Sequence, residues 1–460
     1  SSLSALIPFL FRMTSSPFPP LPAIEITGFT DKFESIYLKA YRIHFEQAGK
    51  TREFDLALRH SSVATLLYHR DRKEFLCVRQ FRPAIFVNTI LKLEENRGKK
   101  MEEVYWAQYD RELGCTIELC AGIIDKDLPL VDIAREEIEE ECGYKVRTED
   151  IHHIASYIVG MDESGSPQHL FYAEIDDSMR LGEGGGNAEE GEFIYKVWLS
   201  ESSARSFLDH PDPHMPPGGL YAFLWWFDRG KAMLSIEESL VDWPPCPSSF
   251  PLNPLPPIDN LRFTKDPPTN RFHPVRMFFN INGIARSWDL APCGDSACVL
   301  LYNTDRRQLI LNQRFRPLLV TAISKVAKDV QGRDVTTLDW PSAPREWPYT
   351  VELCSGHVRP GESVSACAVR NVAAKAGYRI AESSLRFLTK STIGISQGGD
   401  KLSIFYAEVR EADAVKDYVQ FEDVQPYPIK RDAALDLILA RQTPGPPVVH
   451  YAIRWFLSRV

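Results

Sequence analysis

The sequence predicts an α/β protein made of two tandem α/β/α sandwiches, each with a mixed β-sheet, and three observations lead to this fold class. The segment LLYHRDRKEFLCVRQFRP (66–83) returns as LLYNTDRRQLILNQRFRP (300–317), at an offset of 234 residues that holds without a gap from Ser62 to Glu174. Each copy contains short runs of apolar, β-branched and aromatic residues that are typical of strands, and one run with helical spacing. Strands combined with a helix in each repeated unit indicate a layered sandwich.

The repeat divides the chain into four segments. The first residues, SSLSALIPFLFRM, hold an apolar run without the basic region of a signal peptide, so we expect a disordered tail, with Met13 as a candidate start. The proline density of VDWPPCPSSFPLNPLPPIDN excludes helix and central strand, which indicates a semi-extended linker between the copies. The predicted segments are the tail 1–21, the first copy 22–228, the linker 229–262 and the second copy 263–460.

In the first copy the predicted strands are SVATLLYH, KEFLCVRQF, CTIELCAGI, HHIASYIVG and HLFYAEI, in that order. One helix is predicted at 130–142, because Val131, Ala134 and Ile138 recur at helical spacing. YAFLWWF (221–227) is predicted as a closing helix, matched by YAIRWF near the end of the second copy. The glycine-rich, acidic segment LGEGGGNAEEGEF at 181–193 is predicted as a surface loop.

Composition excludes several classes of partner. A formal net charge of −9 disfavours nonspecific binding to nucleic acid or to an anionic membrane, both of which require basic surface. No stretch reaches the 18 or so apolar residues of a membrane span. The nine cysteines include no Cys-x-x-Cys pair, and their odd number fits reduced thiols, so we predict a cytoplasmic protein.

The helix at 130–142 carries five glutamates within 136–141, and their like charges at i,i+3 and i,i+4 cost roughly 1–2 kcal/mol together. Glu137, Glu140 and Glu141 share one face, so their carboxylates are predicted to converge on a hard divalent cation such as Mg²⁺, which prefers oxygen ligands. A simpler interpretation is a solvated acidic helix face, as most charge runs are.

The spacing favours the metal site. From Gly122 the sequence runs through thirteen residues to EEIEEECGY at 136–144, which resembles the Nudix box, Gly-x5-Glu-x7-Arg-Glu-U-x-Glu-Glu-x-Gly-U. That box forms a loop–helix–loop that binds Mg²⁺ or Mn²⁺. The sequence departs from it at two places, with Leu128 where the early Glu is expected and Glu136 where the Arg is expected.

Further motifs resemble the UDP-sugar diphosphatase branch of the Nudix family and, next to it, the ADP-ribose pyrophosphatases. They are VRQFRPA, ELCAG, EECGY, FYAE and the acidic GGG…EEGE loop. The resemblance implies an enzyme that splits a nucleoside diphosphate sugar, with UDP-glucose favoured, into a nucleoside monophosphate and a sugar 1-phosphate. It also implies that the carbonyl of Ala121 is a further metal ligand and that Glu141 is catalytic as well as metal-binding.

Two arginines of the VRQFRP motif are candidates for substrate binding. Arg79 and Arg82 could hold a phosphate or a sugar carboxylate through the bidentate geometry of a guanidinium group. The simpler interpretation is an ion pair with a carboxylate of the protein. Arg314 and Arg316 in the second copy could reach the same site across the domain interface.

The general base is expected in the loop GMDESGSPQ, because related ADP-ribose enzymes supply a glutamate from the loop before the last strand. Glu163 is the first candidate and Asp162 the second, and both could equally be ordinary turn residues. The second copy has Ser396 and Gln397 at those places.

The second copy departs from the box at the ligand positions. It keeps Glu362 and Arg370, which in the family can pair with each other, but has Asn371, Ala374 and Lys375 where the metal ligands belong. We therefore predict that it is catalytically inactive. Relatives are homodimers with crossing amino-terminal strands, so the tandem chain is expected to be a monomer that forms an intramolecular pseudo-dimer. ADP-ribose hydrolysis, or nucleotide-sugar binding with little hydrolysis, are the alternatives.

Overall fold

The computed structural model describes most of both copies and little of the segments outside them. The predicted tail lies almost wholly outside the described residues, and so does most of the predicted linker. The described residues are 21–459 without 36–37, 48, 162–163, 188–191, 231–257, 266–273, 318, 320–334, 338–348, 422–423 and 440–444.

The first copy is built on a seven-stranded sheet in the order β10-β5-β4-β9-β8, with β6 joined to β5 and β7 joined to β4. Strands β4 and β9 are parallel and the other pairs are antiparallel, so the predicted mixed sheet is confirmed. The strands are β4 (Ser62–His69), β5 (Glu74–Phe81), β6 (Cys115–Glu118), β7 (Cys120–Ile123), β8 (Ile151–Val159), β9 (Ser166–Ile175) and β10 (Ile194–Ser200).

The second copy repeats this sheet strand for strand, in the order β16-β15-β14-β19-β18. Ser62 pairs with Gln168 in the first copy and Ser296 pairs with Leu402 in the second, so both partners move by the offset of the sequence repeat. The strands are β14 (Ser296–Asn303), β15 (Gln308–Phe315), β16 (Tyr349–Glu352), β17 (Cys354–His357), β18 (Arg386–Ile393), β19 (Asp400–Val409) and β20 (Val424–Lys430).

Helices cover both faces of each sheet. In the first copy α3 packs on one face through Ile133, Ala134 and the adjoining Ile138, while α4 and α5 cover the other face. In the second copy α9 lies on the face that corresponds to α3, and α10 and α11 correspond to α4 and α5. The helices are α2 (Pro83–Leu91), α3 (Leu130–Glu137), α4 (Glu201–Asp209), α5 (Pro217–Trp225), α9 (Val364–Ala376), α10 (Arg431–Leu439) and α11 (Pro447–Arg459).

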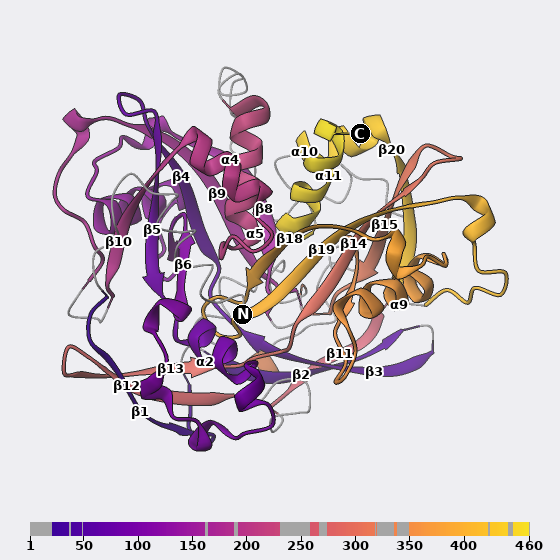
Figure 1. The fold of residues 1–460 in the computed structure, drawn as a ribbon, viewed down its shortest axis with the longest axis horizontal. Coiled ribbons are helices and arrows are strands. Elements are labelled where there is room, and N and C mark those ends of the chain that lie inside the picture. Colours follow the sequence, from indigo (N-terminus) through magenta and orange to yellow (C-terminus); the bar gives the residue numbers. More distant parts are fainter. Residues whose placement is uncertain are drawn as a thin grey trace.

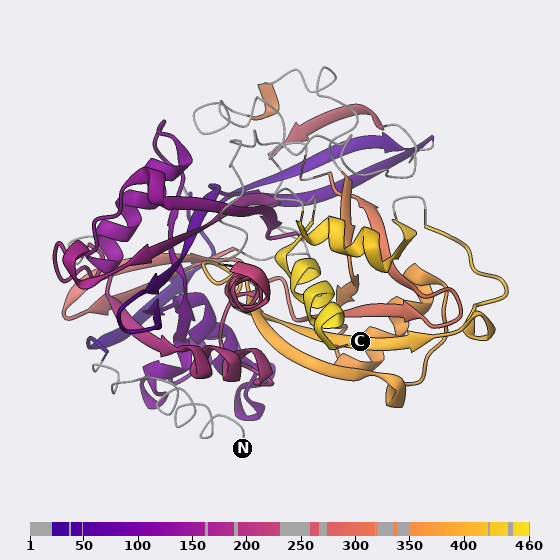
Figure 2. The same cartoon turned by 90° about the horizontal axis from the view of Figure 1, so that it is seen from above.

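The two copies share one hydrophobic core where the closing helices meet. Phe223 of α5 and Ile453 of α11 belong to the same buried cluster. At the edge of this contact Arg454 of α11 lies 3.1 Å from Asp228, just after α5. Seen from above, the helix α11 (yellow) lies beside the end-on α5 (magenta), with one sheet on either side (Figure 2). The copies are therefore packed as the predicted pseudo-dimer.

The amino-terminal strands of the copies are exchanged. Strand β1 (Ile24–Thr30) of the first copy pairs with the hairpin β12 (Val275–Ile281) and β13 (Ile284–Leu290) of the second. Reciprocally, β11 (Ile258–Thr264) pairs with β2 (Lys39–Gln47), which is joined to β3 (Lys50–Leu58). Figure 1 shows β12 and β13 running beneath the first copy and β2 and β3 beneath the second. Strand β11 lies across the end of the segment 229–262 predicted as linker.

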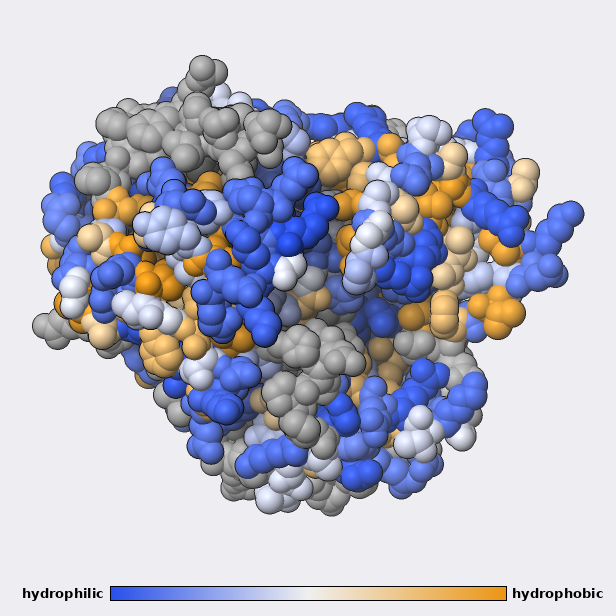
Figure 3. Space-filling model, turned by 60° about the horizontal axis from the view of Figure 1, so that its bottom comes forward, coloured by the Kyte–Doolittle hydropathy of each residue, from blue (hydrophilic) through white to orange (hydrophobic). Residues whose placement is uncertain are grey.

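Each exchanged hairpin packs against the opposite copy. Met277 and Phe279 of β12 share a buried cluster with Phe86 of α2, and the ring of Phe45 on β2 lies 5.3 Å from that of Phe315 on β15. On the face toward these hairpins, hydrophilic residues cover much of the surface and hydrophobic ones form separate groups (Figure 3). In the described part of the chain, no helix has the length and apolar character that crossing a membrane requires.

Candidate active site

The glutamate-bearing helix changes its winding at the site. Strand β7 leads into α3, which is α-helical to Glu137 and continues as a π-turn from Ile138 to Cys142, in which the N–H of Gly143 reaches the carbonyl of Ile138. The corresponding helix of the second copy, α9, is α-helical throughout and also ends at a glycine with φ of 74°. A π-turn inside a helix is frequent at functional sites. The sequence predicted an uninterrupted α-helix here, because a single widened turn has no composition signal.

The glycine-rich segment 181–187 lies at the surface and closes the end of this helix. Backbone N–H groups of Gly185 and Gly186 donate to the carbonyls of Glu141 (2.9 Å) and Glu140 (3.3 Å). A Cβ atom on Gly184, whose φ is +64°, would lie 2.4 Å from the carbonyl oxygen of Glu141. The glycines therefore permit a close approach that satisfies carbonyls left without partners by the helix end. The sequence predicted a loop but not its contact with the site.

The carboxylate of Glu141 lies against strand β7. The residue is 6% exposed, and its carboxylate accepts a hydrogen bond from the N–H of Ala121 at 3.0 Å. Burial raises the pKa of Glu141 well above its usual range, and the charge of Glu137 raises it further. The hydrogen bond from Ala121, a contact with Cys120 and the charge of Arg82 oppose this effect only in part, so a further positive charge would stabilise the carboxylate of Glu141.

The carboxylate of Glu137 lies against Gly122, the residue that follows Ala121. A Cβ atom on Gly122 would lie 1.9 Å from a carboxylate oxygen of Glu137, so the absence of a side chain at Gly122 makes room for this carboxylate. Burial raises the pKa of Glu137 to about 7, with further contributions from Glu140 and Glu192. Two half-buried or buried acids that repel each other are the chemical setting in which a divalent cation is stabilising.

The three predicted ligands do not form a closed set. Glu141 faces the peptide of Ala121, Glu137 lies against Gly122, and Glu140 is exposed. Among the described residues no three His, Cys, Asp or Glu side chains already surround a common point suited to a metal ion. The donor atoms nevertheless fit a hard cation, because they are carboxylate oxygens, the ligand atoms that such cations prefer.

Both candidate arginines lie in ion pairs. Arg82 makes a bidentate pair with Glu118, at 2.8 Å and 2.7 Å, and Arg79 is fully buried with its guanidinium group on Glu112. These contacts correspond to the simpler interpretation given above. Arg316 repeats the pair with Glu352, at 2.6 Å and 2.7 Å and with the same separation of 36 residues along the chain. The duplicated pair braces β15 against β16 as it braces β5 against β6.

At the ligand positions of the second copy the structure places no carboxylate. Asn371 donates a hydrogen bond to the carbonyl of Cys367 at 2.8 Å, and its side chain lies against Gly356 as that of Glu137 lies against Gly122. Ala374 offers a methyl group, and the ammonium of Lys375 donates to the carbonyl of Ser355. The predicted pair of Glu362 with Arg370 is confirmed, at 2.6 Å and 2.7 Å.

The loop that carries the candidate bases Asp162 and Glu163 has both residues outside the described part of the chain. Their roles therefore stay predictions. The neighbouring Ser164 is described, and its N–H donates to the carbonyl of Gly160 at 2.8 Å, which closes a turn.

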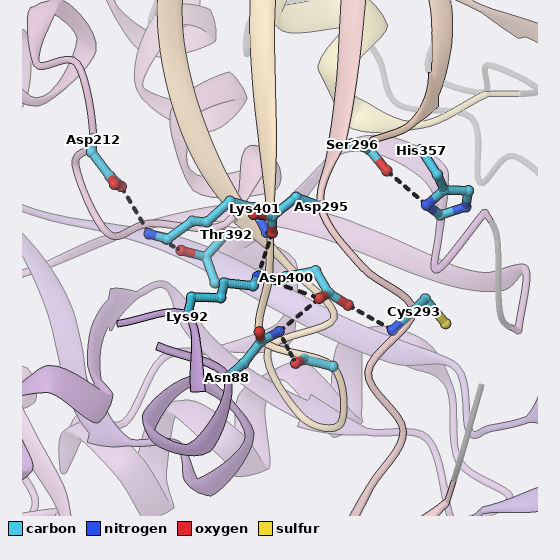
Figure 4. Close-up of polar contacts among 11 residues, drawn as sticks. Asn88, Lys92, Asp212, Cys293, Asp295, Ser296, His357, Thr392, Asp400 and Lys401 are labelled. Carbon is cyan, nitrogen blue, oxygen red and sulfur yellow. Dashed lines mark hydrogen bonds and ion pairs between the residues drawn. The ribbon is translucent and has the colours of Figure 1, made fainter. Parts of the chain in front are cut away.

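A polar network that the sequence did not predict joins α2 of the first copy to the second copy (Figure 4). The amide of Asn88 donates to Asp400 (2.6 Å) and to the carbonyl of Gly398 (2.7 Å), and Asp400 also accepts from the N–H of Cys293. Nearby, Lys401 donates to Asp212 at 2.8 Å. Residue 166 of the first copy, which aligns with Asp400, is a serine, so no repeated motif marks this contact.

Comparison with known proteins gives several relatives, although no protein-family model matches the chain. Uridine diphosphate glucose pyrophosphatase NUDT14 of Mus musculus is 34% identical over 212 residues, which is 44% of this chain and 94% of that protein. The protein of the same name from Bos taurus is 36% identical with the same coverage. GDP-mannose pyrophosphatase of Cronobacter sakazakii is 34% identical over 145 residues, 31% of this chain and 63% of that protein.

One solved structure, described as a crystal structure of an ADP compounds hydrolase, aligns with 42% of this chain and 88% of its own. Its sequence identity is 16% and its TM-score is 0.28, a score at which the superposition carries no weight.

Proposed function

Because the chain belongs to the Nudix family of UDP-sugar diphosphatases, we propose that its first copy hydrolyses the pyrophosphate bond of a nucleoside diphosphate sugar. The products are a nucleoside monophosphate and a sugar 1-phosphate, and UDP-glucose is the favoured substrate. The observation that supports this function best is the pair of crowded acids Glu137 and Glu141, placed on the peptides of Ala121 and Gly122. The second copy has Asn371 and Lys375 at the positions of these two acids.

The cofactor in this proposal is Mg²⁺ or Mn²⁺. Glu137, Glu140 and Glu141 would hold it, together with the carbonyl of Ala121. When bound, such an ion neutralises the pyrophosphate, polarises a phosphoryl oxygen and lowers the pKa of an attacking water. Its charge would also offset the burial and the mutual repulsion that raise the pKa of Glu137 and of Glu141.

The residues around the ion have separate proposed roles. Arg82 and Arg79 contribute positive charge beside the substrate phosphates, and their ion pairs with Glu118 and Glu112 fix where that charge lies. Arg82 is the better placed of the two for contact with a ligand, since its side chain is 17% exposed and that of Arg79 is not exposed at all. Glu163, and after it Asp162, remain the candidate bases that take a proton from the attacking water.

The second copy has a structural role in this proposal. It supplies β12 and β13 beneath the first copy and the network around Asp400, and it turns over no substrate. The protein would act as a monomer, because the exchange of strands that relatives make between subunits is completed inside one chain. A cytoplasmic location is in keeping with the eight described cysteines, which form no disulfide with one another.

A substrate panel tests the function. The full chain would be given UDP-glucose, ADP-ribose and GDP-mannose in separate reactions, and release of the nucleoside monophosphate would be measured with Mg²⁺ and with a chelator. We expect metal-dependent release of UMP from UDP-glucose at the highest kcat/KM. A higher kcat/KM for ADP-ribose would make ADP-ribose the preferred substrate instead of UDP-glucose. Binding of the nucleotides without release of a nucleoside monophosphate would favour a protein that binds nucleotide sugars with little hydrolysis.

A further inference from the structure

The second copy has a positive charge where the first has a negative one. Lys375 aligns with Glu141, and its ammonium donates a hydrogen bond to the carbonyl of Ser355, which aligns with Ala121. In the first copy the carboxylate of Glu141 accepts from the N–H of Ala121. Lys375 and Glu141 therefore contact equivalent residues on equivalent strands. Lys375 binds the backbone carbonyl oxygen, whereas Glu141 binds the backbone N–H group.

The frame around this charge is retained. Gly356 leaves room for the side chain of Asn371, whose oxygen would lie 2.2 Å from a Cβ atom built there, as Gly122 leaves room for Glu137. The formal charge at the three ligand positions changes from −3, for three glutamates, to +1, for Asn, Ala and Lys. A site with this charge repels a divalent cation and attracts an anion.

Neighbouring cations strengthen the effect. Burial lowers the pKa of Lys375 to about 8, and the charges of Arg314 and Arg316 lower it further. Arg316 is bound by both carboxylate oxygens of Glu352, so its charge is largely balanced within the second copy. Lys375 is half-buried as a residue.

We propose that the second copy is a metal-independent binding site for the diphosphate group of a nucleotide, with the ammonium of Lys375 in place of the divalent cation. A lysine is a compact point charge that binds phosphate well, and partial burial makes its attraction for an anion stronger than at an exposed surface. Without acids to hold a metal, the site binds the diphosphate and does not cleave it. The choice of a nucleotide as ligand depends on the proposed function, whereas the preference for an anion does not.

The test is equilibrium binding of UDP, and separately of inorganic pyrophosphate, to the full chain in excess chelator. The protein carries Glu137→Gln and Glu141→Gln, so that the first copy neither binds metal nor turns over substrate. We expect one metal-independent site by calorimetry, weakened at least 10-fold by Lys375→Met and within about threefold of the starting affinity in Lys375→Arg. Lys430→Met is the matched control, because Lys430 is exposed and pairs with Gln308 at the end of β15 remote from Arg314.

Absence of binding at millimolar UDP and pyrophosphate would overturn the proposal, and so would equal affinities in Lys375→Met and Lys430→Met. Thermal unfolding of each variant shows whether a loss of binding reflects a loss of fold, and Lys375→Arg retains the charge if Lys375→Met proves unstable. Turnover of UDP-glucose by a Lys375→Met protein with an intact first copy is measured separately. That turnover tests the proposed hydrolysis, and binding in chelator tests the second site.

Discussion

The ammonium of Lys126 lies 2.7 Å from the carboxylate of Glu136. This ion pair joins the loop before α3 to α3 itself, and the loop supplies the cation, whereas in the second copy the helix supplies it. In the second copy the helix contributes the cation, Arg370, and the loop contributes the anion, Glu362. Glu136 occupies the position of that arginine. The two departures from the Nudix box at Leu128 and Glu136 are thus accompanied by a substitute pair from a different loop position.

The first prediction exchanges this pair for the one in the second copy. Glu136→Arg alone places like charges at Lys126 and should lower the melting temperature slightly, by about 1 to 2 °C, since the side chain of Lys126 is 56% exposed and that of Glu136 is 33% exposed. Leu128→Glu combined with Glu136→Arg should recover the loss. Differential scanning calorimetry of wild type, the single variant and the double variant measures the melting temperatures. Equal melting temperatures for the single and double variants would contradict the coupling between loop and helix.

The second prediction concerns Glu141. Glu141→Gln removes a buried carboxylate from the proposed metal site while keeping its size, so turnover should fall by about 100-fold or more with the fold intact. Glu139→Gln is the matched control, because Glu139 lies on the same helix but pairs with Arg135 at 3.2 Å. Near wild-type turnover in Glu141→Gln, or an equal loss in Glu139→Gln, would exclude Glu141 from catalysis.

The third prediction follows from the raised pKa of Glu137. A carboxyl whose pKa is about 7 in the folded protein and near 4.5 in the unfolded one binds more protons when folded, so without metal it favours the fold at low pH and opposes it as the pH rises toward 7 and above. In a chelator, Glu137→Gln should therefore raise the melting temperature relative to wild type at pH 8, and by less at pH 5. A divalent cation should remove the advantage at pH 8 by binding wild type alone. A difference independent of pH would show that Glu137 is not crowded in solution.

The fourth prediction tests the inactivity of the second copy. A chain with Glu137→Gln and Glu141→Gln should release no nucleoside monophosphate from any nucleotide sugar, although Asn371, Ala374 and Lys375 are untouched. Product release is measured over hours at high enzyme concentration, with chelator as the blank. Turnover above that blank that depends on a divalent metal would reveal a second working centre.

The fifth prediction concerns residues 22–228 produced alone. This piece would lose α11 from the shared core and β12 from beneath α2, so an apolar surface that is buried in the full chain would be exposed. It should self-associate or aggregate, while the full chain should scatter light as a monomer. A soluble, fully active monomer of 22–228 would show that the second copy is not needed as a partner.

The sequence predicts those parts of the fold that depend on local pattern. The repeat, the strands and the helix beneath Glu137 follow from register and periodicity, and the pairing of Glu362 with Arg370 follows from the motif. The contact between Asn88 and Asp400 joins residues 312 positions apart, and neither has a counterpart in a repeat that would mark it. The π-turn at Ile138 and the packing of Gly184 on Glu141 depend on how the glycine-rich loop closes the helix end, which is decided in three dimensions.

The exchange of amino-terminal strands has a consequence for how the protein is made. Ile24 of β1 pairs with Ile281 of β12, so 257 residues separate the first strand from its partner along the chain. At about 5 to 20 residues per second, a ribosome takes roughly 13 to 50 s to complete β12 after β1 has been synthesised. During that interval the nascent first copy carries an unpaired strand edge and an uncovered α2, which are surfaces that chaperones bind. The first copy thus depends on a strand that is synthesised long after it. A ribosome that stalls before Ile281 would release a first copy that cannot complete its own fold.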